Sequence, residues 1–548
     1  MAHASIALAI CDGFVGLTAA IGAVFVIPTL PNDLYRFHYL YGETLPTVGL
    51  GLVAAICLGA LFALLTGKKL GAALSITAGA ALVVFELVES FAVGSPLTPP
   101  VGLGVSGHVA LWLQPFYIAV GLGMVVLGGL SPAGFANRPL TRFDVVTGRA
   151  SRTAAIALVV LTVGFGGFYG WAATSTGTSM YAREFAWGDG TTYDWSRFPS
   201  RALPAAATPY RFPEALQPYD LRAATDSANP DQFFISNDST ALLVIQHDRL
   251  VLERYFNGTD RSTMITSFSN TKSWNSAMVG AAIAAGYIHT VDDPVTAYIP
   301  ELSRKDPRFA SVTIRELLQQ RSGIGLNKSG LLDNDDAVLY NTTALRQAVL
   351  DRVRIVDTPG TVFYYNDFNP LLIGIVLERA TRRSVTEWLE KTLWDPLGPQ
   401  YPGSFSIDSL SGGFEKMPSG LNATPIDLMR LGVLYLHGGS WNGVQLVPSE
   451  WVAESVDSAK ASPSMMYSTS LSYGMGWWTQ RIDGIEVYYT WGNHGEYVMV
   501  VPSLDIVIGR FGRQYGLGAA MGDQGGGIAG HVMWPQILTR IATTVAGT

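Results

Sequence analysis

The stretch that decides the fold is Ser267-Phe268-Ser269-Asn270-Thr271-Lys272-Ser273. Strand-like residues 242–246 and 250–256 precede it, and an apolar helical pattern follows it. Ser269 and Lys272 stand three residues apart, so on a helix they share one face. A serine at a helix N-terminus beside a lysine can become a nucleophile. The pattern alone is weak, because an N-capping serine followed by a solvated lysine has the same letters.

The first third of the chain is far more apolar than the rest. The 548 residues are 14% charged, the mean hydropathy is +0.25, and residues 1–174 hold few of the charges. Five segments are long and apolar enough to span a bilayer: residues 5–28, 45–65, 70–93, 108–130 and 153–173. The sequence therefore predicts an all-α membrane domain of about five transmembrane helices over residues 1–174.

Loop charges predict the orientation of these spans. Positive residues gather in the loops of one side: Lys68, Lys69, Arg138, Arg142, Arg149 and Arg152. The opposite loops hold only Arg36. Because positive residues mark the cytoplasmic side, we expect a multi-pass protein of the cytoplasmic membrane, with lipid as a partner and its remaining chain on the outer, extracytoplasmic side.

Composition also excludes several kinds of chemistry. Cys11 and Cys57 both fall in predicted spans, so neither disulfides nor thiol chemistry are expected in the exported part. The chain has no basic stripe, which argues against nucleic acid as a partner. Its eight histidines follow no metal-ligand spacing. We therefore expect no metal and no other cofactor.

The exported part divides into two regions. Residues 175–230, rich in Ser, Thr, Pro and aromatics, are predicted to be an extended connector, and residues 231–548 a catalytic domain. Two strands are expected within residues 231–256, helices over 314–320, 343–353, 371–381, 385–393, 424–435, 448–455 and 530–545, and strands over 473–479, 485–489, 497–501 and 506–511. This order predicts an α+β fold, in which an antiparallel sheet is flanked by helices and carries an inserted helical subdomain.

Two further segments carry candidate site residues. A turn at Pro359-Gly360 leads to Tyr365 and Asp367, a phenol and a carboxylate on one short loop. A lysine beside this phenol would favour the phenolate, although a packed aromatic loop has the same sequence. The second segment, Gly492-Asn493-His494-Gly495, lies between two predicted strands. Its glycines allow close approach to a ligand, or form a hairpin turn.

These segments together resemble the serine beta-lactamase and penicillin-binding-protein superfamily. The resemblance rests on the order of four motifs: the Ser269-x-x-Lys272 stretch, the helix end at Ser322-Gly323-Ile324, the Tyr365-x-Asp367 loop and Gly492-x-His494-Gly495. The strand over residues 250–258 and Tyr473-Gly474-Met475-Gly476-Trp477-Trp478 support it. It spans roughly residues 180–540 and is nearest the class C-like branch of esterases, D-amino peptidases and 6-aminohexanoate-dimer hydrolases. The helix end is interpreted as a structural glycine cap.

The resemblance implies a role for each residue. Ser269 would be the acylated nucleophile, Lys272 would share or relay its proton, and Tyr365 would be the general base and acid. The Asn493 backbone N–H would join that of Ser269 in an oxyanion hole, with Gly492, His494 and Asp367 around the substrate. Thr490-Trp491-Gly492 replaces the Lys-Thr-Gly strand of penicillin-recognising relatives, so the lysine for a substrate carboxylate is missing.

The leading hypothesis is a membrane-anchored serine hydrolase that cleaves a small ester or amide through an acyl-serine intermediate. An alternative is a non-catalytic, penicillin-binding-like sensor of cell-envelope fragments. A third makes the membrane part the active unit, because Asp12, Glu86 and Glu89 are charges in the membrane region. Whether Lys272 or Tyr365 takes the serine proton stays open at this point.

Overall fold

The computed structural model describes residues 168–187 (except 169 and 173), 190–328, 334–463, 471–513 and 527–547. Residues up to Gly190 and residues from Thr191 form two separate units, and the second holds the predicted site. The predicted membrane domain lies outside the described residues, except for its last few positions. Among the described residues, no helix combines the length and the apolarity needed to cross a bilayer.

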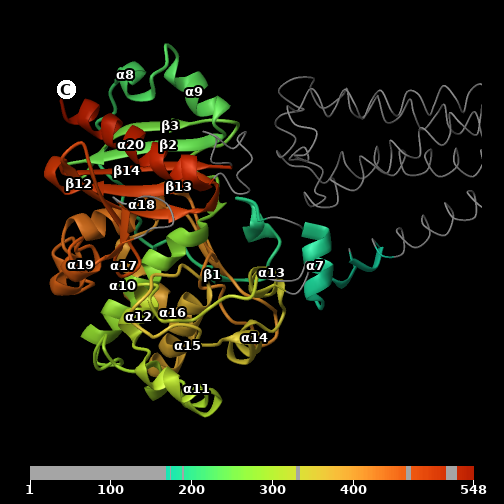
Figure 1. Cartoon of the computed structure of the whole chain (residues 1–548). Helices are drawn as coiled ribbons and strands as arrows, with labels where there is room; N and C mark the ends of the chain where they lie inside the picture. Colours follow the sequence, from blue (N-terminus) through green and yellow to red (C-terminus); the bar gives the residue numbers. More distant parts are fainter. Residues whose placement is uncertain are drawn as a thin grey trace, which may run out of the picture. The chain divides into compact units, whose positions relative to one another are not determined.

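An eight-stranded antiparallel sheet forms the centre of the second unit (Figure 1). In spatial order its strands are β3 (Arg249–Tyr255), β2 (Ser239–Gln246), β14 (Ile506–Gly512), β13 (Glu496–Val501), β12 (Ile485–Gly492), β11 (Trp478–Ile482), β10 (Leu471–Tyr473) and β9 (Ser462–Pro463). Both ends of the domain sequence thus meet in one sheet, with β14 beside β2. This arrangement confirms the predicted antiparallel sheet.

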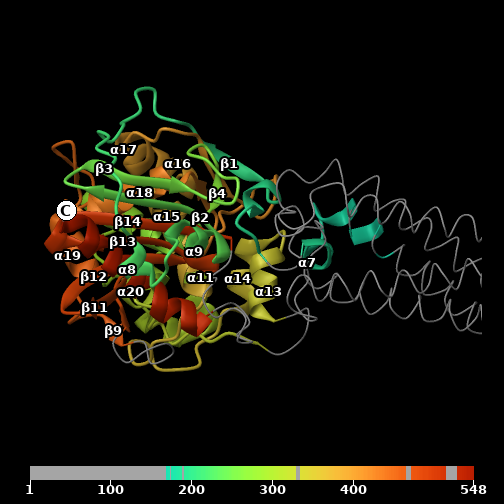
Figure 2. The same ribbon diagram turned by 90° about the horizontal axis from the view of Figure 1, so that it is seen from above.

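Helices cover both faces of this sheet, as Figures 1 and 2 show. One face packs against α20 (Gly527–Ala546), α8 (Arg222–Thr225) and α9 (Pro230–Ser236), and the other against α10 (Thr271–Ala284) and α18 (Pro425–Leu436). In β2, Leu243 faces the α10 side and Leu242 faces the α20 side. Alternate side chains of each central strand are buried in two separate cores, one on each face of the sheet. The sequences of these strands are therefore continuously apolar.

A helical subdomain is inserted between the two ends of the sheet. It contains α11 (Pro300–Lys305), α12 (Ile314–Leu318), α13 (Asp335–Asn341), α14 (Leu345–Arg352), α15 (Phe368–Thr381), α16 (Val385–Leu389) and α17 (Asp395–Leu397), and α19 (Ser449–Ser455) follows later. A smaller sheet, in the order β1 (Ser200–Leu203), β5 (Gly403–Ser406), β6 (Leu421–Ala423) and β4 (Ile265–Thr266), leads into the Ser269 segment. The predicted insertion is confirmed.

Two predictions of local structure were wrong. Residues 175–230 are not simply extended, since they contain α7 (Met180–Trp187), β1 and α8, and Leu203 and Leu221 are fully buried. The strand predicted over residues 473–479 is two strands, β10 and β11. Gly476, at φ +84° between them, takes a left-handed conformation that glycine adopts without strain, and this breaks the extended chain.

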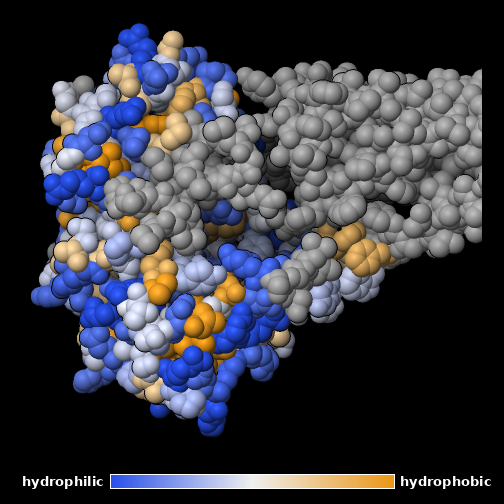
Figure 3. All heavy atoms as spheres, viewed as in Figure 1, coloured by the Kyte–Doolittle hydropathy of each residue, from blue (hydrophilic) through white to orange (hydrophobic). Residues whose placement is uncertain are grey.

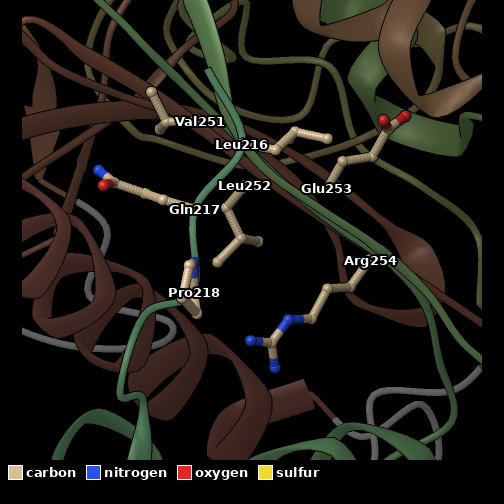
Figure 4. Close-up of a pocket in the computed structure, with 7 residues that line it drawn as sticks. All are labelled: Leu216, Gln217, Pro218, Val251, Leu252, Glu253 and Arg254. Carbon is tan, nitrogen blue, oxygen red and sulfur yellow. The ribbon is translucent and has the colours of Figure 1, made fainter. Parts of the chain in front are cut away.

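The free edge of the sheet, at β3, is partly covered by its own chain. The Ala215 N–H donates to the Leu250 carbonyl at 2.8 Å, and the Gln217 N–H donates to that of Val251 at 3.2 Å. Figure 4 shows the cavity of about 240 Å³ beside this edge, lined by Leu216, Gln217, Pro218 and β3 residues Val251–Arg254. None of these residues belongs to the Ser269 site. On the face seen in Figure 3, hydrophilic residues predominate among those described.

Candidate active site

Ser269 lies where a tight turn becomes a helix. The turn η3 (Phe268–Asn270) runs directly into α10, so the predicted position at a helix start is confirmed. Phe268, just before Ser269, has φ +46°, a conformation that a bulky residue adopts only under strain. The Ser267 N–H donates to the Leu421 carbonyl of β6 at 2.9 Å, which fixes the turn from behind. The surrounding strands thus force Ser269 into a sharply bent backbone.

Lys272 is buried beneath Ser269, with 4% of its side chain exposed. Its Nζ lies 2.9 Å from Ser269 Oγ, 3.1 Å from the Pro418 carbonyl oxygen and 2.9 Å from Asp367 Oδ1. It also lies 4.9 Å from the centre of the Tyr365 ring. Three of the residues singled out in the sequence, Ser269, Tyr365 and Asp367, therefore converge on one amine.

The Tyr365 loop is held from below by the end of α12. The Gln320 carbonyl accepts from the Tyr364 N–H at 2.8 Å, and Gln320 Oε1 accepts from the Asn366 N–H at 3.0 Å. Gln320 is itself at φ +56°. Helix α12 ends at Leu318, so the predicted glycine cap at Gly323 was wrong. Gly323 instead lets the Asp357 carbonyl approach, since an added Cβ would lie 2.3 Å from that oxygen.

Aromatic rings fix the direction of Tyr365. Its ring stacks on Trp478 with centroids 5.6 Å apart, and meets Tyr473 edge-on at 5.7 Å. Tyr473 is buried, and burial, followed by the charges of Tyr365 and Asp367, raises its pKa well above the ordinary value, against the opposing effect of Lys272. Tyr473 therefore stays a neutral phenol, whereas Tyr365 is the half-buried phenol at the lysine. These ring contacts also fit the alternative interpretation, in which the Tyr365 segment is a packed aromatic loop.

Gly492 brings the end of β12 against the nucleophile turn. A Cβ added to Gly492 would lie 2.4 Å from the Ser267 carbonyl oxygen, so no larger residue fits this approach. Asn493, His494 and Gly495 form the turn η7, and β13 begins immediately afterwards. The His494 ring meets the Phe268 ring edge-on at 5.0 Å. The structure thus brings the Gly492–Gly495 segment against the turn that carries Ser269. The same segment is a hairpin turn between β12 and β13, as the alternative interpretation expected.

A buried arginine holds the η7 turn. Arg510 donates to the carbonyls of His494 at 2.9 Å and Gly495 at 2.6 Å, and its guanidinium lies 4.3 Å from the Trp534 ring. The next residue, Glu496, is fully buried, and burial raises its pKa well above the ordinary value, although Arg510 opposes this. Burial thus favours the protonated form of Glu496 beneath the turn. Sequence reasoning missed both Arg510 and Gln320, because each acts through backbone groups of a distant loop.

The geometry suits acyl transfer. The Ser269 hydroxyl, the Lys272 amine and the Tyr365 ring are close together, and the η7 turn packs against the turn that carries Ser269. Within the described residues, no group of His, Cys, Asp and Glu is arranged to hold a metal ion. The arrangement is compatible with the chemistry of a serine nucleophile.

Comparison with known proteins agrees with this chemistry. The family model described as "Beta-lactamase" matches residues 236–523, and the chain belongs to this family. The 6-aminohexanoate-dimer hydrolase of Paenarthrobacter ureafaciens is 27% identical over 331 residues, which are 56% of this chain and 81% of that protein. The protein flp of Staphylococcus aureus is 22% identical over 169 residues, 29% of this chain and 33% of that protein.

A solved structure from Bacillus anthracis, provisionally named a 6-aminohexanoate-dimer hydrolase, has the same fold. It superimposes with a TM-score of 0.57 at 22% sequence identity, and the match covers 65% of this chain and 93% of that chain. The beta-lactamase-like α+β fold predicted from the sequence is therefore confirmed for the described domain.

Proposed function

We propose that this chain cleaves an ester or amide through an acyl-Ser269 intermediate. The observation that carries the proposal is the contact of Lys272 Nζ with Ser269 Oγ at 2.9 Å, beside the Tyr365 ring. Ser269 Oγ would attack the carbonyl carbon while its proton passes to a neighbouring base. The resulting oxyanion would be held by backbone N–H groups of Ser269 and Asn493. The leaving group takes up a proton and departs, and water then hydrolyses the acyl-enzyme.

The substrate is proposed to lack the carboxylate that a beta-lactam carries. Thr490, which replaces the expected lysine, is 2% exposed, and its Oγ1 accepts from the Val498 N–H at 3.2 Å. The Thr490 hydroxyl is therefore buried in the sheet, where it adds a hydrogen bond between β12 and β13. Lys272 already faces the carboxylate of Asp367. Neither residue therefore supplies an uncompensated cation for an anionic substrate.

A panel of substrates checks this proposal. We expect short-chain esters, D-amino acid amides or linear amide dimers to be turned over with a kcat/KM about 10- to 150-fold above that of a chromogenic beta-lactam, because one missing charge-assisted contact is worth roughly 1.5–3 kcal/mol. A Thr490→Lys variant should not improve esters but should narrow the gap for the beta-lactam. Preferred turnover of the beta-lactam by the unaltered chain would contradict the proposal.

We also propose that residues 1–174 anchor the hydrolase to the cytoplasmic membrane, with the catalytic domain on the outer side. The five apolar segments and the positive residues of their alternate loops support this placement. Protease added to intact spheroplasts should remove the catalytic domain and leave a membrane-bound fragment. A cytoplasmic marker protein is the control for leakage. Complete protection of the catalytic domain in sealed spheroplasts would reverse the orientation.

A further inference from the structure

Helix α7 is folded back on the helix that ends the fifth apolar segment (teal in Figure 1). The described residues between 168 and 175 are helical, residues 176–178 form a turn, and α7 follows. The Phe185 ring of α7 meets the Phe168 ring edge-on, with centroids 4.2 Å apart. Phe168 lies about two helical turns before the end of its own helix. This contact therefore shows that α7 runs back alongside the helix that precedes it.

A buried arginine fixes the other end of this fold-back. Arg183 of α7 is 1% exposed, and its Nε donates to the Thr176 carbonyl at 2.7 Å. Its guanidinium lies 5.2 Å from the centre of the Trp187 ring. Carbonyls at a helix C-terminus lack partners within the helix, and basic side chains commonly satisfy them. Contacts at Thr176 and at Phe168 therefore hold α7 at a defined level along the end of the fifth segment.

Three large aromatic residues of this helix pair are exposed. Phe168 is 42% exposed, Trp171 41% and Tyr181 47%. Exposed large apolar side chains that gather in one region mark contacts with a membrane or a protein partner. Residues 153–182 contain no Asp, Glu, Lys or Arg, so the uncharged stretch continues from the predicted span through the turn and into α7. Trp and Tyr are enriched where a span meets water, because their rings are apolar and carry one polar group. The continuity with the span favours lipid as the partner.

We infer that α7 is an interfacial helix, which lies in the headgroup layer of a phospholipid bilayer and places Trp171 and Tyr181 there. This inference rests on the proposed membrane anchoring and extends it. Residues 153–173 cross the bilayer, and the fold-back sets α7 at the level where that segment leaves it. Arg183 suits this depth, because its side chain reaches back to the polar turn, as long basic side chains do near an interface. The chain thus leaves the membrane through a structured element instead of an extended tether.

The test measures the bilayer depth of three positions in the full-length protein, reconstituted in phosphatidylcholine and phosphatidylglycerol vesicles. Replacing Cys11 and Cys57 by serine removes the native thiols. One cysteine at a time is then introduced and labelled with an environment-sensitive fluorophore. Tyr181→Cys reports on α7. Gly170→Cys and Gly177→Cys are matched references, because a Cβ added to either glycine meets no atom within 4 Å. Lipids with a spin label on the headgroup or deep in the acyl chain serve as quenchers.

The three probes should report three depths. Gly170→Cys lies within the apolar segment and should be quenched mainly by the acyl-chain label. Gly177→Cys lies in the polar turn and should be quenched little by either lipid. Tyr181→Cys should be quenched mainly by the headgroup label, at least about twofold more than Gly177→Cys, because an interfacial helix lies about 5–10 Å into the headgroup boundary. Tyr181 is exposed, so its replacement keeps the Arg183 and Phe185 contacts that hold α7.

The outcomes separate the inference from the anchoring on which it rests. If Gly170→Cys is quenched while Tyr181→Cys behaves like Gly177→Cys, α7 lies in water and the inference is wrong, although the anchoring stands. If neither lipid quenches any of the three probes, the proposed anchoring itself fails. With Gly170→Cys quenched, a blue-shifted Tyr181→Cys probe that neither lipid quenches would show that protein covers α7, and this too would overturn the inference.

Discussion

Ser269→Ala is expected to abolish covalent labelling by a serine-reactive fluorophosphonate probe and to lower ester or amide turnover by about 10⁴-fold or more. Loss of a nucleophile removes the covalent path and leaves only binding and oxyanion stabilisation. The N-caps of η3 and α10 are Ser267 and Asn270, so alanine at position 269 leaves both helix starts in place. The measurement is gel fluorescence of labelled membranes, combined with turnover of the best substrate from the panel.

Ser273→Ala is the matched control for this variant. Ser273 lies one turn further along α10, is buried, and donates to the Gly476 carbonyl at 2.6 Å. Its loss should cost about 1 kcal/mol of stability and retain the labelling. If the folded parent protein is never labelled, the chain is better explained as a non-catalytic sensor of cell-envelope fragments. If Ser269→Ala is still labelled, another serine is the nucleophile.

The sequence predicts the local parts of the site better than their contacts. The spacing of Ser269 and Lys272 on one helical face is a short-range property, and so is the loop that carries Tyr365 and Asp367. The Pro418 carbonyl could not be anticipated, because it reaches Lys272 across 146 positions of the chain. A local sequence motif does not show which distant backbone oxygen will contact a buried amine.

Asp367 shows how the structure changes the meaning of a predicted residue. From the sequence, the carboxylate in that loop was expected to lie around the substrate. In the structure its Oδ1 is engaged by Lys272. The Gly476 conformation and the folding of residues 175–230 were missed for the same reason: tertiary contacts outweighed local preference at both places.

The second large effect is expected for Tyr365→Phe, which should lower the rate of Ser269 labelling and turnover by about 10²–10⁴-fold, the usual contribution of a general base. Phenylalanine keeps the ring that stacks on Trp478 and lies over Lys272. The fold should therefore be unchanged, and the loss is attributed to the hydroxyl. Near-normal KM with a reduced kcat would fit that cause.

Tyr364→Phe provides the comparison, because it removes a phenol from the neighbouring position. Tyr364 is tied to the Gln320 carbonyl through its backbone N–H, which the substitution keeps. Its labelling rate should stay within about threefold of the parent rate, below the range of a catalytic proton transfer. If Tyr365→Phe behaved in the same way, the proton of Ser269 would have to pass to Lys272.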